Sequence, residues 1–120
     1  MIQSYKDLEV WKKSVSLTLE IYKLTLKFPK EELYGLTIQI RRAIVSLPSN
    51  IAEGRSRGHV NEFIQFLKIA YGSGAELETQ LIIAKEMGYI TEKDYLSSTE
   101  KLSEIMRMLN GLISKLKPNN

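Results

Sequence analysis

Apolar residues recur every three or four positions along most of the chain, which is the spacing of an α-helix that buries one face. Within residues 33–54 the apolar positions are Leu33, Leu36, Ile40, Ile44, Leu47 and Ile51. No stretch alternates apolar and polar residues in the way that a half-buried strand does. The pattern predicts an all-α fold with four helices, over about residues 5–27, 31–53, 60–87 and 92–116.

Local signals for helix ends agree with these ranges. Ser4 with Asp7, and Thr91 with Asp94, have the spacing of a capping pair at a helix start. A glycine or a proline follows each helix and favours its end. These residues are Pro29, Gly54, Gly88 and Pro118.

The predicted helices are similar in length, and the breaks between them are short, roughly three to six residues. A connection of this length cannot cross the bundle, so each helix turns back beside the one before it. We therefore predict one domain over residues 1–120, folded as a left-handed antiparallel four-helix bundle of up-down-up-down topology.

The composition is that of an ordinary globular protein. The chain has 120 residues, of which 43% are apolar and 26% are charged, and it has no cysteine. The lack of cysteine excludes disulfides, thiolate metal sites and a cysteine nucleophile. The N-terminus lacks the apolar core of a signal peptide, and no apolar run approaches the roughly 20 residues of a membrane span. We expect a cytoplasmic protein with no membrane partner.

The sequence shows no motif for catalysis. Its single histidine, His59, lies in a predicted loop, and Ser56 stands three residues before it, where a di-metal bundle would need a glutamate. There is no serine-nucleophile signature and no glycine-rich phosphate loop. These observations predict a protein that is not an enzyme and that needs no metal or cofactor.

A row of polar residues runs beside the apolar face of residues 31–53, also at helical spacing. Its place next to a buried face predicts that it meets another helix. Because the second and third helices are antiparallel, we expect Arg42 and Glu76 to form an ion pair that fixes their register. The predicted interhelical contacts are Gln39, Arg42, Ser46, Asn50 (or its neighbour Ser49), Glu53, Ser73 and Glu76.

Two features inside the helices require an explanation. Pro48 removes one backbone donor and frees the carbonyl of Ile44, and it predicts a bend that wraps the helix around its neighbours. Gly72 and Gly74 each cost about 1 kcal/mol relative to alanine in mid-helix, and they predict the close approach of another helix. The functional alternatives are a binding surface at the bend and a ligand beside the glycines.

Positive charge is concentrated in the first half of the chain. Residues 1–60 hold ten Lys or Arg and six Asp or Glu, whereas residues 61–120 hold seven and eight. The formal net charge of +3 therefore comes from the first half. The candidate contacts to nucleic-acid phosphates are Arg41, Arg55, Arg57, Lys12 and Lys13. The alternative is a solvated surface with no ligand.

The first helix carries two apolar rows on nearly opposite faces. One row is Leu8, Trp11, Val15, Leu19 and Tyr22, and the other is Val10, Leu17, Ile21, Leu24 and Phe28. A bundle core needs one row, so the other predicts a subunit interface. We assign this interface to Leu17, Ile21 and Leu24. The alternative is that the protomer itself covers both rows.

Residues 39–54 read Gln-Ile-Arg-Arg-Ala-Ile-Val-Ser-Leu-Pro-Ser-Asn-Ile-Ala-Glu-Gly. This helix resembles the hallmark of the bacterial 23S rRNA intervening-sequence proteins, which is close to Q-(L/I)-R-R-A-x-x-S-(I/L)-P-x-N-I-A-E-G. The other stretches that resemble this family are Asp7–Trp11, Phe28–Leu36, Phe66–Ser73, Glu76–Thr79 and Gly88–Ile90. The resemblance therefore covers nearly the whole chain.

The resemblance implies a four-helix protomer, a homopentamer, and a gene that lies in an insertion of a bacterial 23S rRNA gene or elsewhere in the genome. It also implies a relation to the accessory variability proteins of diversity-generating retroelements, which are basic and engage nucleic acid and a reverse transcriptase. This chain departs from the pattern in its modest positive charge, in Gly74, and in the missing Ser or Thr cap before the third helix.

Two functions of different classes follow from these observations. The first is a non-catalytic oligomer that binds RNA or other nucleic acid through a basic surface. The second is a protein-interaction scaffold for a partner enzyme, such as a reverse transcriptase, without direct nucleic-acid binding. A continuous positive surface on the oligomer would indicate the first function, and an apolar or polar patch left exposed after assembly would indicate the second.

Overall fold

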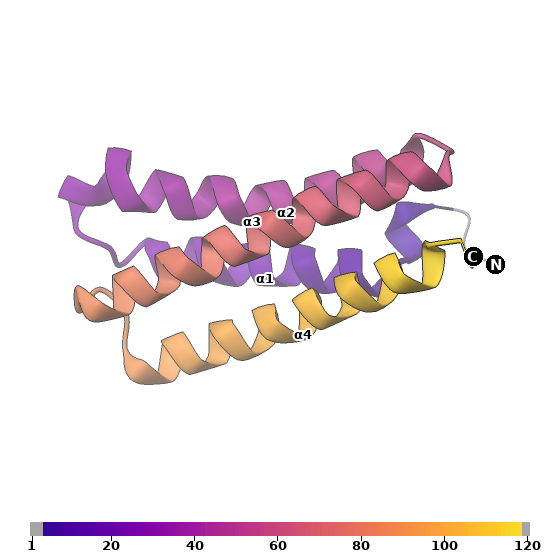
Figure 1. The fold of residues 1–120 in the computed structure, drawn as a ribbon. Coiled ribbons are helices and arrows are strands. Elements are labelled where there is room, and N and C mark those ends of the chain that lie inside the picture. The colour runs from indigo at the N-terminus through magenta and orange to yellow at the C-terminus, as the bar shows by residue number, and fades with distance from the viewer. Residues whose placement is uncertain (1–3, 119–120) are drawn as a thin grey trace.

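The computed structural model describes residues 4–118 and contains four long α-helices in that part of the chain (Figure 1). They are α1 (Glu9–Thr25), α2 (Ile38–Ser56), α3 (Val60–Glu86) and α4 (Glu92–Leu116). Short turns of other helix types precede α1 and α2, and these are η1 (Tyr5–Asp7), η2 (Lys30–Glu32) and η3 (Leu33–Thr37). The described residues contain no strand, so the prediction of an all-α protein is confirmed.

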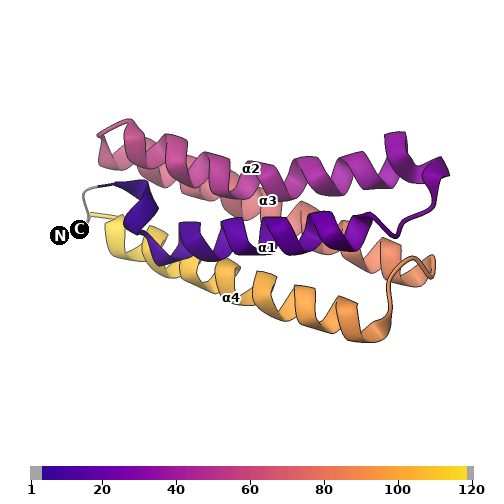
Figure 2. The same cartoon turned by 180° about the vertical axis from the view of Figure 1, so that it is seen from behind.

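Consecutive helices run in opposite directions and lie side by side (Figures 1 and 2). α1 packs against α2 and α4, and α3 packs against the same two helices. The most extensive contact is between α2 and α3. The α2–α3 turn lies at the same end as the start of α1 and the end of α4, and the other two connections lie at the opposite end. This is the predicted antiparallel bundle.

The apolar faces of the helices form one shared core. Ile40, Ile44, Leu47 and Ile51 of α2 are fully buried, as their spacing predicts. The other large side chains that are fully buried are Leu17, Ile21, Leu67, Leu77, Leu81, Leu102, Ile105 and Leu109. Burial of each such side chain stabilises the fold by roughly 1.5–3 kcal/mol relative to exposure.

The beginning of α1 differs from the prediction. Ser4 and Asp7 do form a capping box, in which the Ser4 amide donates to the Asp7 carboxylate at 3.2 Å. They cap the 3₁₀ turn η1 and not a continuous helix, because Leu8 adopts an extended conformation with φ −75° and ψ 125°. α1 therefore begins at Glu9.

The beginning of α2 also differs from the prediction. Residues 33–37 form a π-helical turn, inside which Gly35 leaves helical geometry with φ −113° and ψ −111°. The Glu32 carboxylate caps this turn by accepting a hydrogen bond from the Leu36 amide at 3.1 Å. α2 therefore begins at Ile38, after the 3₁₀ turn η2 and the π-helical turn η3.

The end of α2 shows that the predicted stop at Gly54 is wrong. The helix continues to Ser56, and Gly58 is the residue that adopts the left-handed conformation, with φ 80°. A Cβ atom on Gly54 would lie 2.5 Å from the Cβ of Phe66 and 3.2 Å from Cδ1 of Phe63. Glycine at this position therefore allows α2 and α3 to approach closely.

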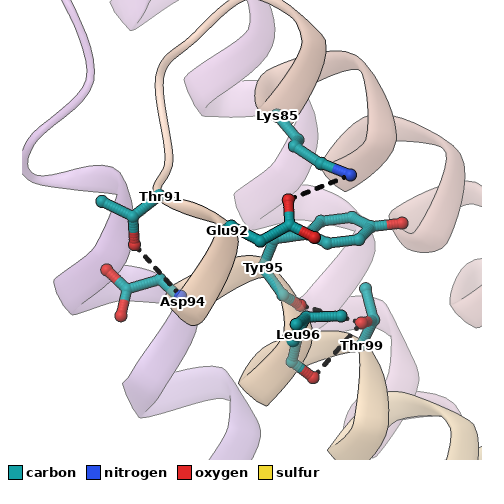
Figure 3. Close-up of polar contacts among 7 residues, drawn as sticks. All are labelled: Lys85, Thr91, Glu92, Asp94, Tyr95, Leu96 and Thr99. Carbon is teal, nitrogen blue, oxygen red and sulfur yellow. Dashed lines mark hydrogen bonds and ion pairs between the residues drawn. The ribbon is translucent and has the colours of Figure 1, made fainter.

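The predicted boundaries of α3 and α4 agree with the structure to within one residue. α3 ends at Glu86, and Gly88 has the left-handed conformation of a C-terminal glycine, with φ 79°. Thr91 caps α4, because its hydroxyl accepts a hydrogen bond from the Asp94 amide at 3.1 Å (Figure 3).

An ion pair between the end of α3 and the start of α4 spans their connection. Lys85 lies 3.1 Å from the Glu92 carboxylate and 4.7 Å from the centre of the Tyr95 ring (Figure 3). The hydrogen bond to Glu92 is the main reason that the pKa of Lys85 is raised. The Thr99 hydroxyl donates to the carbonyl of Tyr95 at 2.8 Å one turn further along α4 (Figure 3).

The remaining helix-breaking residues have different roles. α2 passes through Pro48, which is buried inside the helix. A Cβ atom on Gly74 would lie 3.1 Å from Cγ of Met106, whereas one on Gly72 would have no heavy atom within 4 Å. At Gly74 the contact is therefore with the Met106 side chain of α4, and the predicted close approach of another helix backbone is not seen at either glycine.

Two glycine substitutions test the packing of α2 on α3. Gly54→Ala should lower the free energy of unfolding by about 1–3 kcal/mol, because the added methyl group overpacks the contact with Phe66. Gly72→Ala should raise it by about 0.5–1 kcal/mol, because alanine has the higher helix propensity and its methyl group meets nothing in the protomer. Urea denaturation followed by circular dichroism measures both values. Equal effects of the two substitutions would contradict the role of Gly54.

Candidate functional site

A polar cluster joins α2 to α3 near the middle of the bundle. The hydroxyl oxygens of Ser46 and Ser73 are 2.8 Å apart. The Asn50 amide donates to the carbonyl of Ser46 at 2.8 Å and to its hydroxyl at 2.9 Å. Of these bonds, the one between Ser46 and Ser73 crosses between the helices as predicted, whereas both bonds of Asn50 stay within α2. All three bonds are partly buried. Ser49, the alternative to Asn50, is exposed.

The other predicted members of the polar row do not cross between helices. Gln39, Arg42 and Glu76 are exposed, and within residues 4–118 no ion pair or hydrogen bond joins Arg42 to Glu76. The predicted pair is wrong for a geometric reason. Each of these two residues lies one turn from the serine contact and is rotated by about 40–60° around its helix, toward solvent.

Three of the basic residues predicted to bind phosphates are paired with acidic residues of the protomer. Lys12 lies 3.5 Å from Glu9 and Lys13 lies 3.2 Å from Glu104. Arg57 lies 2.8 Å from Glu53, which is one turn earlier on α2. These pairs are open to water, so each contributes little to stability and is easily exchanged for another partner.

Arg57 also contacts α3. Its guanidinium lies 5.1 Å from the centre of the Phe66 ring, over the face that packs beside Gly54. The hydrogen bond to Glu53 is the main reason that the pKa of Arg57 is raised. An arginine side chain is in any case charged at neutral pH.

Arg41 is separated from Arg55 and Arg57. Its Nε donates to the Thr25 hydroxyl at 2.9 Å, and its guanidinium lies 4.8 Å from the centre of the Tyr22 ring. Arg41 and Arg55 are also about 21 Å apart along the axis of α2, at 1.5 Å per residue. The candidate phosphate contacts therefore do not form one cluster, because Arg41 attaches α2 to α1.

Charge is shared unevenly between the two ends of the bundle. Residues 4–12, 53–62 and 115–118 form the end that carries the α2–α3 turn, which we call the basic end (Figure 1). These segments hold six Lys or Arg and four Asp or Glu, and so supply +2 of the net charge of +3. Arg55, Arg57 and Lys12 belong to this end.

The assignment of a subunit interface to Leu17, Ile21 and Leu24 is corrected by the structure. These side chains are 2%, 0% and 8% exposed, because their row faces the core between α2 and α4. No partner can reach them while the protomer is folded.

The opposite row of α1 faces solvent in its second half, whereas Leu8 is buried and Trp11 and Val15 are half-buried. Leu19 is 61% exposed and Leu26 is 76% exposed, and Tyr22 and Val45 are each 39% exposed. α1 and α2 lie side by side where this row runs (Figure 2). We call this surface the α1–α2 face, and its apolar members are Trp11, Val15, Leu19, Tyr22, Leu26, Ile38 and Val45.

A contact that sequence reasoning missed joins the two connections at the other end of the bundle. The Tyr89 hydroxyl donates to the Glu32 carboxylate at 2.8 Å, and the same carboxylate accepts from the Leu36 amide. Both bonds lower the pKa of Glu32, and the bond from Tyr89 is the larger of the two causes. The bond to Glu32 also raises the pKa of Tyr89. The two residues are 57 positions apart, and no local pattern pairs them.

Residues 4–118 contain no group of three or more His, Cys, Asp or Glu side chains that could hold a metal ion. No helix in this part of the chain is long and apolar enough to cross a membrane.

These features define a four-helix bundle with polar contacts between its helices and an exposed apolar face. The chain belongs to the 23S rRNA-intervening sequence protein family, whose model matches residues 6–111. The recognition of this family from the sequence is therefore confirmed.

Among solved structures, the chain is similar to a protein of unknown function of the S23 ribosomal protein family from Bacteroides thetaiotaomicron. The two chains are 28% identical and superimpose with a TM-score of 0.78, and the match covers 87% of this chain and 97% of the other. A comparison with curated proteins found no match.

The contact between Tyr89 and Glu32 predicts a pH-dependent contribution to stability. Because the folded pKa of Glu32 is lowered, the contribution is fully present above the unfolded pKa of about 4.3 and is lost as pH falls through the folded pKa. Tyr89→Phe should therefore destabilise the protein at pH 7 and much less at low pH. Urea denaturation across this range measures the difference.

Tyr34→Phe provides the matched control for this experiment. Tyr34 is 91% exposed, so removal of its hydroxyl should change stability little at any pH. A loss on Tyr89→Phe that is the same at pH 7 and at low pH would contradict the role of the Glu32 carboxylate.

Proposed function

We propose that this protein is a non-catalytic homo-oligomer that assembles through the α1–α2 face. The observation that carries the proposal is the row of large apolar side chains that α1 presents to solvent. Leu19 of α1 and Leu26, the residue that follows α1, are 61% and 76% exposed on the same side as Tyr22. A contiguous exposed row of this kind is typical of a surface that is covered by protein.

A pentamer is the assembly that the family resemblance implies. A closed ring of five uses heterologous contacts, so each protomer must present a second surface that differs from the first. The exposed isoleucines Ile69 and Ile83 of α3 lie near one side of that helix and are 51% and 46% exposed. They are our candidates for the surface that meets the α1–α2 face of the next protomer.

RNA binding by the assembled protein is the second part of the proposal. The net charge of +3 per chain becomes +15 in a pentamer, and five basic ends then act on one nucleic acid together. Lys12, Lys13 and Arg57 are paired with carboxylates, so phosphates must compete with these partners. Such binding is sequence-tolerant, because it uses backbone phosphates and no groove-reading element.

The alternative is a scaffold for a partner enzyme, such as a reverse transcriptase. The exposed apolar side chains support it equally, because the part of the α1–α2 face left free after assembly would receive the partner. The pairing of Lys12, Lys13 and Arg57 within the protomer also favours it over RNA. Measurement of RNA binding separates the two functions.

Charge reversal on the α1–α2 face tests assembly. Leu19→Glu combined with Leu26→Glu should convert the oligomer into a folded monomer of 13.8 kDa, because a buried charge in the interface is strongly unfavourable. Light scattering coupled to size exclusion measures the mass. Leu96→Glu is the matched control, since Leu96 is 53% exposed on α4 and should leave the mass unchanged. A wild-type protein that is monomeric at micromolar concentration would refute assembly.

Charge reversal at the basic end tests RNA binding. Arg55→Glu combined with Arg57→Glu should weaken binding of a fluorescent structured RNA, and the wild-type affinity should fall linearly with salt on logarithmic axes. Lys23→Glu combined with Lys27→Glu makes the same charge change at the opposite end and should have the smaller effect. No binding by the wild type at about 50 mM salt would leave the scaffold function as the supported one.

A further inference from the structure

An apolar groove opens at the basic end of the bundle and is separate from the α1–α2 face. Its volume is about 370 Å³, at the low end of the range for small-molecule sites. The walls come from three helices and the residue that precedes α1. Their apolar side chains are Leu8, Val60, Phe63, Leu112 and Leu116.

The local backbone explains why this groove is open. α2 ends at Ser56, and Gly58 turns the chain in a left-handed conformation so that α3 begins at Val60. Gly58 lines the groove and a Cβ atom there would meet no heavy atom within 4 Å, so the turn leaves space above Phe63. Val60 is 53% exposed, while Leu112 and Leu116 are half-buried.

Within residues 4–118, the polar side chains that line the groove are Arg55 and His59, and none of the lining residues carries a carboxylate. The guanidinium of Arg55 has five N–H donors in a planar fork and already makes a contact within the protein, so a bound carboxylate would share the guanidinium with that contact. The groove therefore combines an apolar wall with a cationic rim.

Another cavity of the bundle has a different character. The cavity between α1 and α4 is about 190 Å³ in volume and is lined by Glu20, Lys23, Lys27 and Asp94, together with two serines and Leu24. Its mixed charges favour neither an anion nor an apolar chain. The groove at the basic end has charge of one sign beside apolar side chains, which is the combination that an amphiphilic anion requires.

We propose that this groove binds a medium-chain fatty acid, with its carboxylate on Arg55 and its hydrocarbon chain against Val60, Phe63 and Leu112. The carboxylate matches the fork of the guanidinium, and two parallel N–H···O bonds fix its orientation. The hydrocarbon chain covers apolar surface that the protomer leaves wet. This site does not depend on assembly, and it shares Arg55 with the proposed RNA-binding surface.

The experiment is isothermal titration calorimetry of the full chain with decanoate, kept below its micelle-forming concentration. Decanoate should bind with one site per chain and about tenfold more tightly than octanoate, because each buried methylene adds to the affinity. Decylammonium, which has the same hydrocarbon chain and the opposite charge, should not bind. Equal binding of decanoate and decylammonium, or no binding of decanoate, would overturn the proposal.

Substitutions in the groove test which residues bind decanoate. Arg55→Gln should weaken decanoate binding about tenfold or more, because a charge-assisted pair of hydrogen bonds is lost. Val60→Asp should abolish binding, and it should leave the fold intact because an acidic residue is favourable in the first turn of a helix. Arg42→Gln and Ile82→Asp are the matched controls, on exposed positions outside the groove. Loss of binding in the controls, or its retention in Val60→Asp, would contradict the assignment.

Discussion

The close contact between α2 and α3 is the constraint on which the rest of the structure depends. Gly54 allows the backbone of α2 to approach the Cβ atom of Phe66 on α3. The hydrogen bond between the hydroxyls of Ser46 and Ser73 fixes the register further along these two helices. Because α2 and α3 are held this close, the turn between them is short, and Gly58 supplies the left-handed conformation that the turn needs.

The surfaces of the bundle follow from this packing. α1 is left to cover the seam between α2 and α4, and it turns Leu17 and Ile21 inward to do so. Leu19 and Leu26, on the opposite side, are then left exposed. The basic residues are instead spread over several positions, and several of them are paired with carboxylates. Exposed apolar side chains therefore mark the α1–α2 face more clearly than the basic residues mark any face of the protein.

Signals that act within a few residues predicted much of the structure. The buried row from Ile40 to Ile51, the Thr91 cap and Gly88 depend on helical spacing or local backbone geometry, and all were read correctly. Choices that depend on distant neighbours were not. Both rows of α1 have the same period, so the sequence does not say which row faces the core. Gly54 resembles a helix stop until Phe66, twelve residues later, shows that it is a packing position.

The bond between Glu32 and Tyr89 has a consequence for how this chain can change in evolution. The Glu32 carboxylate holds both the π-helical turn before α2 and the connection between α3 and α4. An inserted or deleted residue in either connection would move one partner away from the other, so the lengths of these two connections are coupled. Within residues 4–118, no hydrogen bond or ion pair joins residues 57–59 to another connection. Insertions at the two ends of the bundle are therefore subject to different selection, although all three connections lie on the surface.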